Sequence, residues 1–275
     1  MATQLTCVLD DRSVVSISGE DAKSLLQGLV TVDMDRLIDG ACVFGALLSP
    51  QGKIQFDFHI HARGDEFLID IDKSRAGDFL KRMMMYRLRS NVTLTDVSGD
   101  KHVVVSWGQD SEGPLDNRLM AMGARYISDQ NPTATATSND YHTHRINLGV
   151  PEGGKDFAFD DIFPHDAMMD ALNGVDFQKG CYVGQEVVSR VQHRSTARKR
   201  FYLIESKETL PASGGTVMLD DKAVGSIAMS KNKSALGLLR MDKVEGSEDA
   251  LSVDGMHIKA MLPDYFLKFQ AEKAS

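Results

Sequence analysis

One cysteine stands in a sequence context that suits thiol chemistry. Residues 179–186 read KGCYVGQE, which places Cys181 between a glycine and a tyrosine. We expect a helix to start near Val183 or Gly184, so that Cys181 lies just before a helix N-terminus. The unpaired backbone N–H groups and the dipole at such an end favour a thiolate. A reactive thiol is therefore one interpretation of this position.

Two charged neighbours belong to the same segment, and a plainer interpretation stays open. Lys179 would add positive charge near the thiol, and Glu186 would stabilise the first turn of the helix. The partial alternation of apolar and polar residues in GQEVVSRVQHR (184–194) also allows a strand. A lone cysteine is commonly a small buried hydrophobic residue. No acid–base partner is adjacent in the sequence, so the pattern does not identify a Cys–His pair.

The composition indicates a globular protein in a reducing compartment. The chain has 275 residues, of which 42% are hydrophobic, enough for one large or two to three small compact units. Its three cysteines, Cys7, Cys42 and Cys181, are odd in number and scattered, which argues against a disulfide framework. No secretory signal or transit peptide is recognisable, and no apolar run approaches the roughly 20 residues that span a membrane. We expect a cytoplasmic protein without a membrane partner.

The charge distribution is acidic overall and basic in one place. A net charge of −8 argues against a nucleic-acid partner. Basic residues cluster once along the chain, at Arg190, Arg194, Arg198, Lys199 and Arg200. This cluster suits an acidic ligand or partner, and a solvated junction between domains explains it equally well.

The periodicity predicts an α+β protein. SVVSIS (13–18) alternates as a strand, and Ser18 is the expected N-cap of the helix DAKSLLQ. Residues 42–72 indicate a strand followed by a hairpin, and residues 74–89 an amphipathic helix whose methionines 83 to 85 fill the core. VTLTDV and HVVVSWG then resume strands. Hairpins mixed with single helices favour an α+β sheet over a parallel βαβ series.

The second half of the chain changes in texture. Residues 128–140 have the composition of an exposed loop, and YHTHRINLGVP indicates a short helix that ends at Gly149. Beyond Arg200 short strands alternate with turns, which is typical of a small barrel or sandwich. We place the domain boundary near residues 196–200.

Two histidine pairs have the spacing of a metal half-site. HIH (59–61) and HTH (142–144) would put two imidazoles on one face of a strand. Because no third ligand is clustered with either pair, we interpret them as ordinary polar positions and predict no metal site.

The segment LNGVDFQKGCYVGQE (172–186) resembles the signature of the YgfZ/GcvT-type folate-binding family. Members of this family share the fold of the glycine-cleavage aminomethyltransferase and include iron-sulfur cluster assembly or repair factors. Other segments resemble the family in the family's order: 18–34, 46–58, 144–151 and 163–175. The resemblance covers nearly the whole chain. It implies an aminomethyltransferase-like ring of sheet-and-helix units around a central cavity, followed by a C-terminal β-barrel.

The resemblance also implies a ligand, partners and a site. Residues 1–196 would form the folate-binding region, as two interleaved α+β subdomains, and residues 197–275 the barrel domain. The cavity would bind tetrahydrofolate or a one-carbon derivative, with Cys181 as the catalytic thiol at its mouth. The partners would be iron-sulfur client enzymes and cluster assembly proteins. The residues carried over to folate binding are Lys179, Tyr182, Gln185, Glu186, Arg145, Asp33 and Asp166.

Two of these positions depart from the family's pattern or leave an alternative. Asp166 stands where relatives usually carry glutamate, and Asp33 is either a hydrogen-bond acceptor for a pterin ring or a solvated loop residue. The position of the transferases' catalytic aspartate is occupied by Gln55, which cannot hold a proton as a carboxylate does. A shifted alignment would bring Asp57 there instead. Aminomethyl transfer or demethylation therefore stays an alternative, as does a non-catalytic scaffold with a buried thiol.

Overall fold

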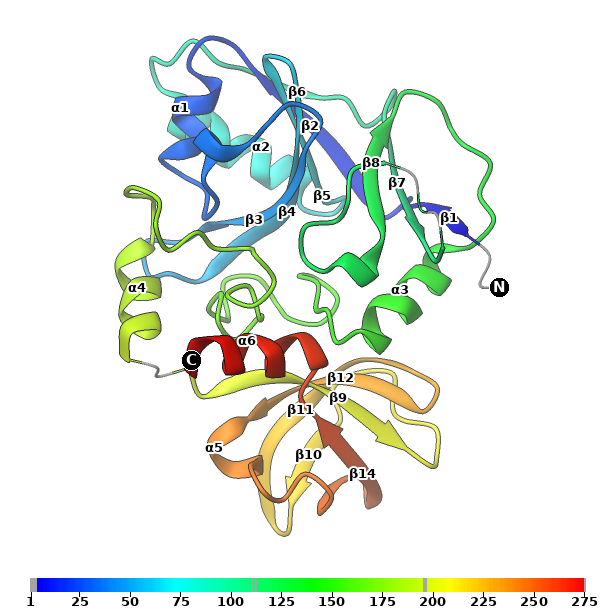
Figure 1. Cartoon of the computed structure of the whole chain (residues 1–275). Coiled ribbons are helices and arrows are strands. Elements are labelled where there is room, and N and C mark those ends of the chain that lie inside the picture. The colour runs from blue at the N-terminus through cyan, green and yellow to red at the C-terminus, as the bar shows by residue number, and fades with distance from the viewer. Residues whose placement is uncertain (1–3, 110, 112, 195–196, 275) are drawn as a thin grey trace. The chain divides into compact units, whose positions relative to one another are not determined.

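The chain divides into two compact units. The computed structural model describes residues 4–109, 111, 113–194 and 197–274 (Figure 1). The first unit contains residues 1–141 and 172–186, and the second contains residues 142–171 and 187–275. The domain boundary expected at residue 196 lies outside the described residues and stays a prediction. Each unit has a hydrophobic core of its own.

The first unit is built on a five-stranded antiparallel sheet (Figure 1). Its spatial order is β3 (Cys42–Leu48), β4 (Ile54–Arg63), β5 (Glu66–Asp72), β2 (Arg12–Ser18) and β6 (Thr93–Asp96). Strands β3, β4 and β5 pair as successive hairpins, because short turns join them and antiparallel neighbours need no crossover. The strand and hairpin predicted over residues 42–72 are confirmed.

One face of this sheet is apolar and is covered by two helices (Figure 1). Helix α1 (Ala22–Gln27) contributes Leu26 to the core, and α2 (Ala76–Arg87) contributes Phe79. The ring of Phe79 packs edge-on against Phe56 of β4, with centroids 5.5 Å apart. The alternation of β4 thus directs its apolar residues towards the helices and its polar residues to the opposite face.

The opposite face carries a buried ionic network centred on Asp70. Arg12 Nε and Arg125 Nε each lie 2.6 Å from a carboxylate oxygen of Asp70, which is fully buried. Burial alone would raise the pKa of Asp70, but the two guanidinium groups hold it well below its usual range. Arg125 belongs to β8 (Ala124–Ser128) of a three-stranded sheet with the order β1–β7–β8. The ion pairs therefore tie the two sheets of this unit together.

His59 is a neutral member of the same network. Its Nε2 lies 3.6 Å from Asp116 Oδ2, and its Nδ1 lies 4.0 Å from Asp70 Oδ2. Burial lowers the pKa of His59 to about 3, and the positive charges of Arg125 and Arg118 act in the same direction. Both histidines of HIH thus lie on the β4–β5 hairpin, as predicted, and both are buried. No group of three or more potential metal ligands occurs in the part of the chain that the structure describes.

The remaining strands of the first unit are β1 (Leu5–Val8) and β7 (His102–Trp107). A short 3-10 helix, η1 (Met34–Arg36), follows α1, and a second, η2 (Met120–Met122), precedes β8. Helices α3 (Ser138–Asn147) and α4 (Gln185–Arg194) each contribute residues to both units. None of the helices in the described part combines the length and hydropathy that a bilayer crossing requires.

The second unit contains a closed six-stranded barrel, as the strand-rich C-terminal sequence predicted. Its spatial order is β10 (Thr216–Leu219), β11 (Lys222–Lys231), β12 (Ser234–Arg240), β9 (Lys199–Ser206), β14 (Met256–Met261) and β13 (Leu251–Val253). Helix α5 (Met241–Val244) follows β12, and the C-terminal α6 (Asp264–Ala274), which the sequence analysis missed, follows β14. The α+β fold class with a C-terminal barrel is confirmed.

Two local predictions are wrong. Ser18 is the last residue of β2 and does not cap α1; Asp21 occupies the N-cap, and its carboxylate accepts the backbone N–H of Asn91 at 2.7 Å. Of the three methionines in α2 only Met83 is buried, whereas Met84 and Met85 are 54% and 58% exposed. Helical geometry separates neighbouring residues by about 100°, so three consecutive residues do not share one buried face.

The burial of neutral His59 predicts a pH dependence of stability. An unfolded histidine titrates near pH 6.5, so between pH 6.5 and about 3 the unfolded chain binds a proton that folded His59 does not. The free energy of unfolding should therefore fall as the pH is lowered through this window. In His59→Gln the slope should decrease by up to one proton, measured by urea unfolding between pH 4.5 and 6.5. The exposed His193→Gln is the control, and equal slopes in all three proteins would contradict the assignment.

Candidate functional site

Lys179 anchors the segment that carries Cys181. Its ammonium group donates to three backbone carbonyl oxygens: those of Gln27 at 2.8 Å, Val30 at 2.7 Å and Val32 at 2.9 Å. A lysine has three N–H donors, so these bonds use its full capacity. Burial lowers the pKa of Lys179 to about 8, against the effect of nearby carboxylates. Lys179 thus fixes the segment to the chain that follows α1, and it has no donor left for a ligand.

Tyr182 and Gln185 hold the segment on its other side. The Lys179 ammonium group lies 5.1 Å from the centroid of the Tyr182 ring, a cation–π contact. Tyr182 is 8% exposed, and burial raises its pKa to about 12. Gln185 Nε2 donates to the carbonyl of Gly180 at 3.3 Å, which closes the loop at the first residue of α4. Tyr182 and Gln185 are therefore also used within the protein.

Gly184 permits the close approach on which this loop depends. Its φ is +83°, a conformation that favours glycine, and a Cβ atom there would lie 2.5 Å from the carbonyl oxygen of Ser49. Any other residue would push the loop off the turn at residues 49–53. The glycine of GQE is therefore required because no side chain fits at this position.

Cys181 lies between these anchors and is exposed, whereas Cys7 and Cys42 are 1% and 4% exposed. Helix α4 begins at Gln185, so the predicted position of the thiol just before a helix is confirmed. Glu186 is exposed in the first turn of that helix, as expected. The segment thus presents one accessible thiol on a backbone that is fixed on both sides.

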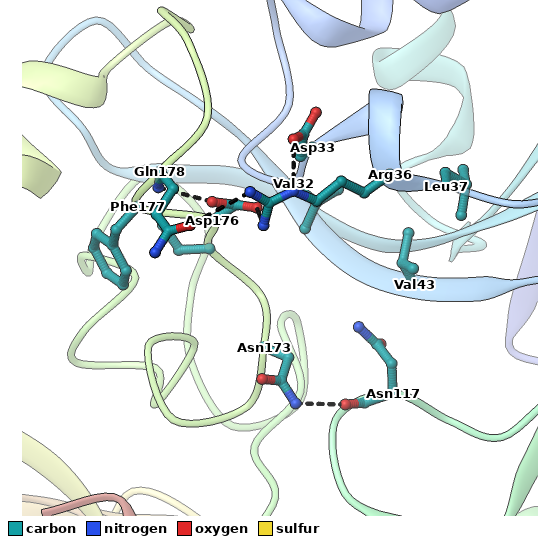
Figure 2. A pocket seen from close by; sticks show the side chains of 11 residues that line it. Val32, Asp33, Arg36, Leu37, Val43, Asn117, Asn173, Asp176, Phe177 and Gln178 are labelled. Atoms are coloured by element: carbon teal, nitrogen blue, oxygen red, sulfur yellow. Dashed lines mark hydrogen bonds and ion pairs between the residues drawn. The ribbon is translucent and has the colours of Figure 1, made fainter. Parts of the chain in front are cut away.

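A pocket of about 410 Å³ lies in the first unit, and part of its wall is formed by the residues that directly precede this loop in the sequence (Figure 2). Its wall includes Asp33 and Arg36 from the η1 region, Asn117, and Asp176 to Gln178, which directly precede Lys179. Phe177 is 38% exposed, and the side chains of Val32 and Val43 add apolar surface. The pocket therefore combines aliphatic and aromatic surface with amides and carboxylates.

Arg36 lies between the two carboxylates of this pocket (Figure 2). Its guanidinium group is 3.3 Å from Asp33 Oδ2 and 3.2 Å from Asp176 Oδ2, and it donates to Gln178 Oε1 at 3.4 Å. Asp33 also accepts the backbone N–H of Asp35, which is the main reason that its pKa is lowered. Asp33 is thus a largely buried, ionised acceptor within the pocket wall.

Two amide side chains complete the polar wall (Figure 2). Asn173 Nδ2 donates to the backbone carbonyl of Asn117 at 2.8 Å, and Asn117 Oδ1 accepts the backbone N–H of Phe44 at 2.6 Å. These bonds join the start of the signature segment to the edge strand β3. The sequence analysis missed Arg36 and Asn117, because no local motif marks them, and it did not single out Phe177, although this residue lies within the signature segment 172–186.

Two of the predicted folate residues lie in the second unit. Arg145 is fully buried, and its Nη1 lies 2.5 Å from Asp156 Oδ2 and 3.0 Å from the carbonyl oxygen of Val150. Since its side chain has no exposed surface and is bonded on several sides, we assign Arg145 a structural role. Asp166 is half-buried and accepts the backbone N–H of Phe163 at 3.1 Å.

The basic cluster is split by burial. Arg200 is 6% exposed and forms a two-point ion pair with Asp170, at 2.8 and 2.9 Å. The other four members, Arg190, Arg194, Arg198 and Lys199, are exposed. The exposed part of the cluster therefore keeps both of its interpretations, a site for an acidic ligand or partner and a solvated junction between domains.

The two candidates for the position of the transferases' catalytic aspartate lie on β4. Asp57 is 2% exposed, and Gln55 is half-buried.

The chain has an aminomethyltransferase-like fold. The crystal structure of glycine cleavage system aminomethyltransferase T from Bartonella henselae superposes with a TM-score of 0.74, covering 96% of this chain and 86% of that one. The sequence identity is 12%, so this likeness concerns the fold alone. Residues 198–268 match the model of the CAF17 C-terminal beta-barrel domain, which agrees with the barrel of the second unit.

Sequence relatives give the family. The mitochondrial iron-sulfur cluster assembly factor IBA57 homolog of Mycosarcoma maydis is 31% identical, over 88% of this chain and 75% of that protein. Human mitochondrial iron-sulfur cluster assembly factor IBA57 is 27% identical, over 94% and 84%. The chain belongs to the family of the IBA57 homologues. The family resemblance of the signature segment is thereby confirmed.

The expected cytoplasmic location is wrong. The relatives from Mycosarcoma maydis, Neurospora crassa and Homo sapiens are all named as mitochondrial proteins. This finding points to mitochondria.

The different burial of the three thiols predicts selective alkylation. Iodoacetamide should modify Cys181 in the native protein and leave Cys7 and Cys42 unmodified, because burial hides these two and raises their pKa. Peptide mass spectrometry after a short reaction at pH 8 identifies the modified residue, and all three should react in 8 M urea. Modification of Cys7 or Cys42 at the rate of Cys181 would contradict the structure.

Proposed function

We propose that this protein acts in the assembly of iron-sulfur clusters and that Cys181 is the residue through which it does so. The observation that carries the proposal is an exposed thiol on a loop fixed by Lys179 and Gly184. Membership in the IBA57 family supports it, since those relatives are named as iron-sulfur cluster assembly factors. Its partners are then the cluster assembly proteins and the enzymes that receive clusters.

The number of thiols limits how the cluster is handled. Iron-sulfur clusters take four protein ligands, mostly cysteine thiolates. Among the described residues no group of three or more potential ligands occurs, and the two other cysteines are buried. A cluster at Cys181 is therefore cargo shared with a second protein or with small thiols. The fixed loop would keep the Cys181 Sγ atom in one exposed position as one ligand of the cluster, and the partner or small thiols would supply the remaining ligands.

We further propose that the pocket beside η1 binds tetrahydrofolate or a one-carbon derivative. A pterin carries N–H donors along one edge, and the carboxylates of Asp33 and Asp176 supply acceptors. The exposed face of Phe177 offers a surface on which an aromatic ring stacks. The volume of about 410 Å³ lies in the range of small-molecule sites. The shared fold with an aminomethyltransferase is consistent with this ligand.

Aminomethyl transfer is the second candidate function, favoured only by the fold. Gln55 in the place of the catalytic aspartate argues against it, because an amide cannot exchange a proton during the transfer. Formation of methylenetetrahydrofolate from an aminomethyl donor would establish this alternative.

The role of Cys181 is tested in cells that depend on this protein. Cys181→Ser should reduce the activity of iron-sulfur enzymes to the level of cells that lack the protein, because a serine hydroxyl does not replace a thiolate ligand. Cys7→Ala, which removes a buried thiol, should preserve that activity at equal protein abundance. Full enzyme activity with Cys181→Ser would refute the thiol mechanism.

Folate binding is tested by anaerobic calorimetric titration with tetrahydrofolate. Saturable binding is expected, and Phe177→Ala should weaken it about tenfold, the equivalent of an aromatic contact of roughly 1.4 kcal/mol. Met120→Ala removes a side chain that is 80% exposed and does not line the pocket, so it should bind as the natural chain does. No binding to the folded natural chain, or equal binding by both variants, would exclude this pocket.

A further inference from the structure

Helix α2 presents apolar and basic side chains to solvent at its C-terminal end. Met84, Met85 and Leu88 are 54%, 58% and 85% exposed. Lys81 lies one turn before Met84 and Met85, so these three share a side of the helix, and Leu88 directly follows the last helical residue, Arg87. We call the exposed residues Lys81, Met84, Met85, Arg87, Leu88 and Arg89 the α2 surface.

The segment that carries the α2 surface is basic, although the chain is acidic overall; the carboxylates of Glu20 and Asp21 lie beside Asn91, which follows this surface in the sequence. Residues 79–95 contain Lys81, Arg82, Arg87 and Arg89 and no acidic residue, whereas the whole chain has a net charge of −8. The nearest acidic residue in the helix is Asp78, whose carboxylate lies 3.6 Å from Lys81 Nζ. Arg87 donates to the carbonyl oxygen of Val92 at 3.2 Å, which leaves the rest of its guanidinium group near the surface.

Helix stability does not explain this surface. Basic residues near a helix C-terminus interact favourably with the dipole, which accounts for Arg87. It does not account for three large apolar side chains in water. Leu88 also has a φ of +42°, which is costly for a residue with a Cβ, and its side chain does not fold back onto the helix as apolar residues at this position commonly do. Exposed apolar groups of this kind mark a contact surface.

We propose that the α2 surface docks an acidic segment of another protein. Carboxylates of the partner would pair with Lys81 and Arg89, and its apolar side chains would pack on the methionines and Leu88. Methionine suits such a contact because its side chain is flexible and polarizable, and both methionine and arginine are enriched in protein interfaces.

Two other classes of partner fit less well. An anionic membrane requires a larger apolar area than three side chains provide. A nucleic acid would pair with the basic groups but leave the three apolar side chains without a partner. The proposal depends neither on Cys181 nor on folate, so it goes beyond the function proposed above.

The test is photo-crosslinking of the full chain in the cells that naturally make it. A photoreactive benzoylphenylalanine replaces Met85, and mass spectrometry identifies the adducts. We expect a protein adduct whose crosslinked peptide is rich in Asp and Glu. The double variant Lys81→Glu with Arg89→Glu should lower the adduct yield at least about tenfold, since like charges across an interface cost several kcal/mol.

The control reverses two exposed charges of the second unit. Lys222→Glu with Lys233→Glu changes the net charge by the same amount and should keep the yield. An unchanged urea unfolding midpoint and the protection of buried Cys7 and Cys42 from native alkylation verify that each variant is folded, without relying on the function proposed above. Adducts with lipid or RNA, a partner peptide without acidic residues, no adduct, or an equal loss in both double variants would overturn the proposal.

Discussion

The ammonium group of Lys179 holds together the part of the molecule on which the proposed chemistry depends. By bonding the carbonyls of Gln27, Val30 and Val32, it joins the signature segment to the chain between α1 and β3. The same chain carries the Asp33 and Arg36 side of the pocket. One buried cation therefore bonds the thiol loop to the segment that forms one wall of the pocket.

In both units, buried ion pairs join separate segments of the chain. Asp70 with Arg12 and Arg125 joins the sheets of the first unit, and Arg145 with Asp156 organises the loops of the second. Such pairs add little net stability over an apolar core, but removing one partner leaves a costly unpaired charge. Each pair therefore constrains the segments of its own unit that it joins.

The proposed function is limited by the fact that, of the three thiols, Cys181 alone is exposed. A protein with four clustered cysteines can store a cluster, whereas a protein that presents Cys181 alone must act together with another molecule. An interaction surface is then as necessary as the thiol. The α2 surface and the pocket lie in the same unit, and we propose them as two separate recognition sites, one for a protein and one for a small molecule.

The sequence by itself determined the α+β class, the hairpins of residues 42–72, the barrel and the position of Cys181 before a helix. These depend on periodicity and on a motif, which are local properties of the chain. Tertiary structure alone decided that Lys179 is an anchor, that Arg145 is buried and that Met84 and Met85 are exposed. The carbonyls that Lys179 bonds are 147 to 152 residues away in the sequence, and no local pattern reports a contact across that separation. Residue types thus indicated which chemistry was available, and long-range packing decided which side chains are free to perform it.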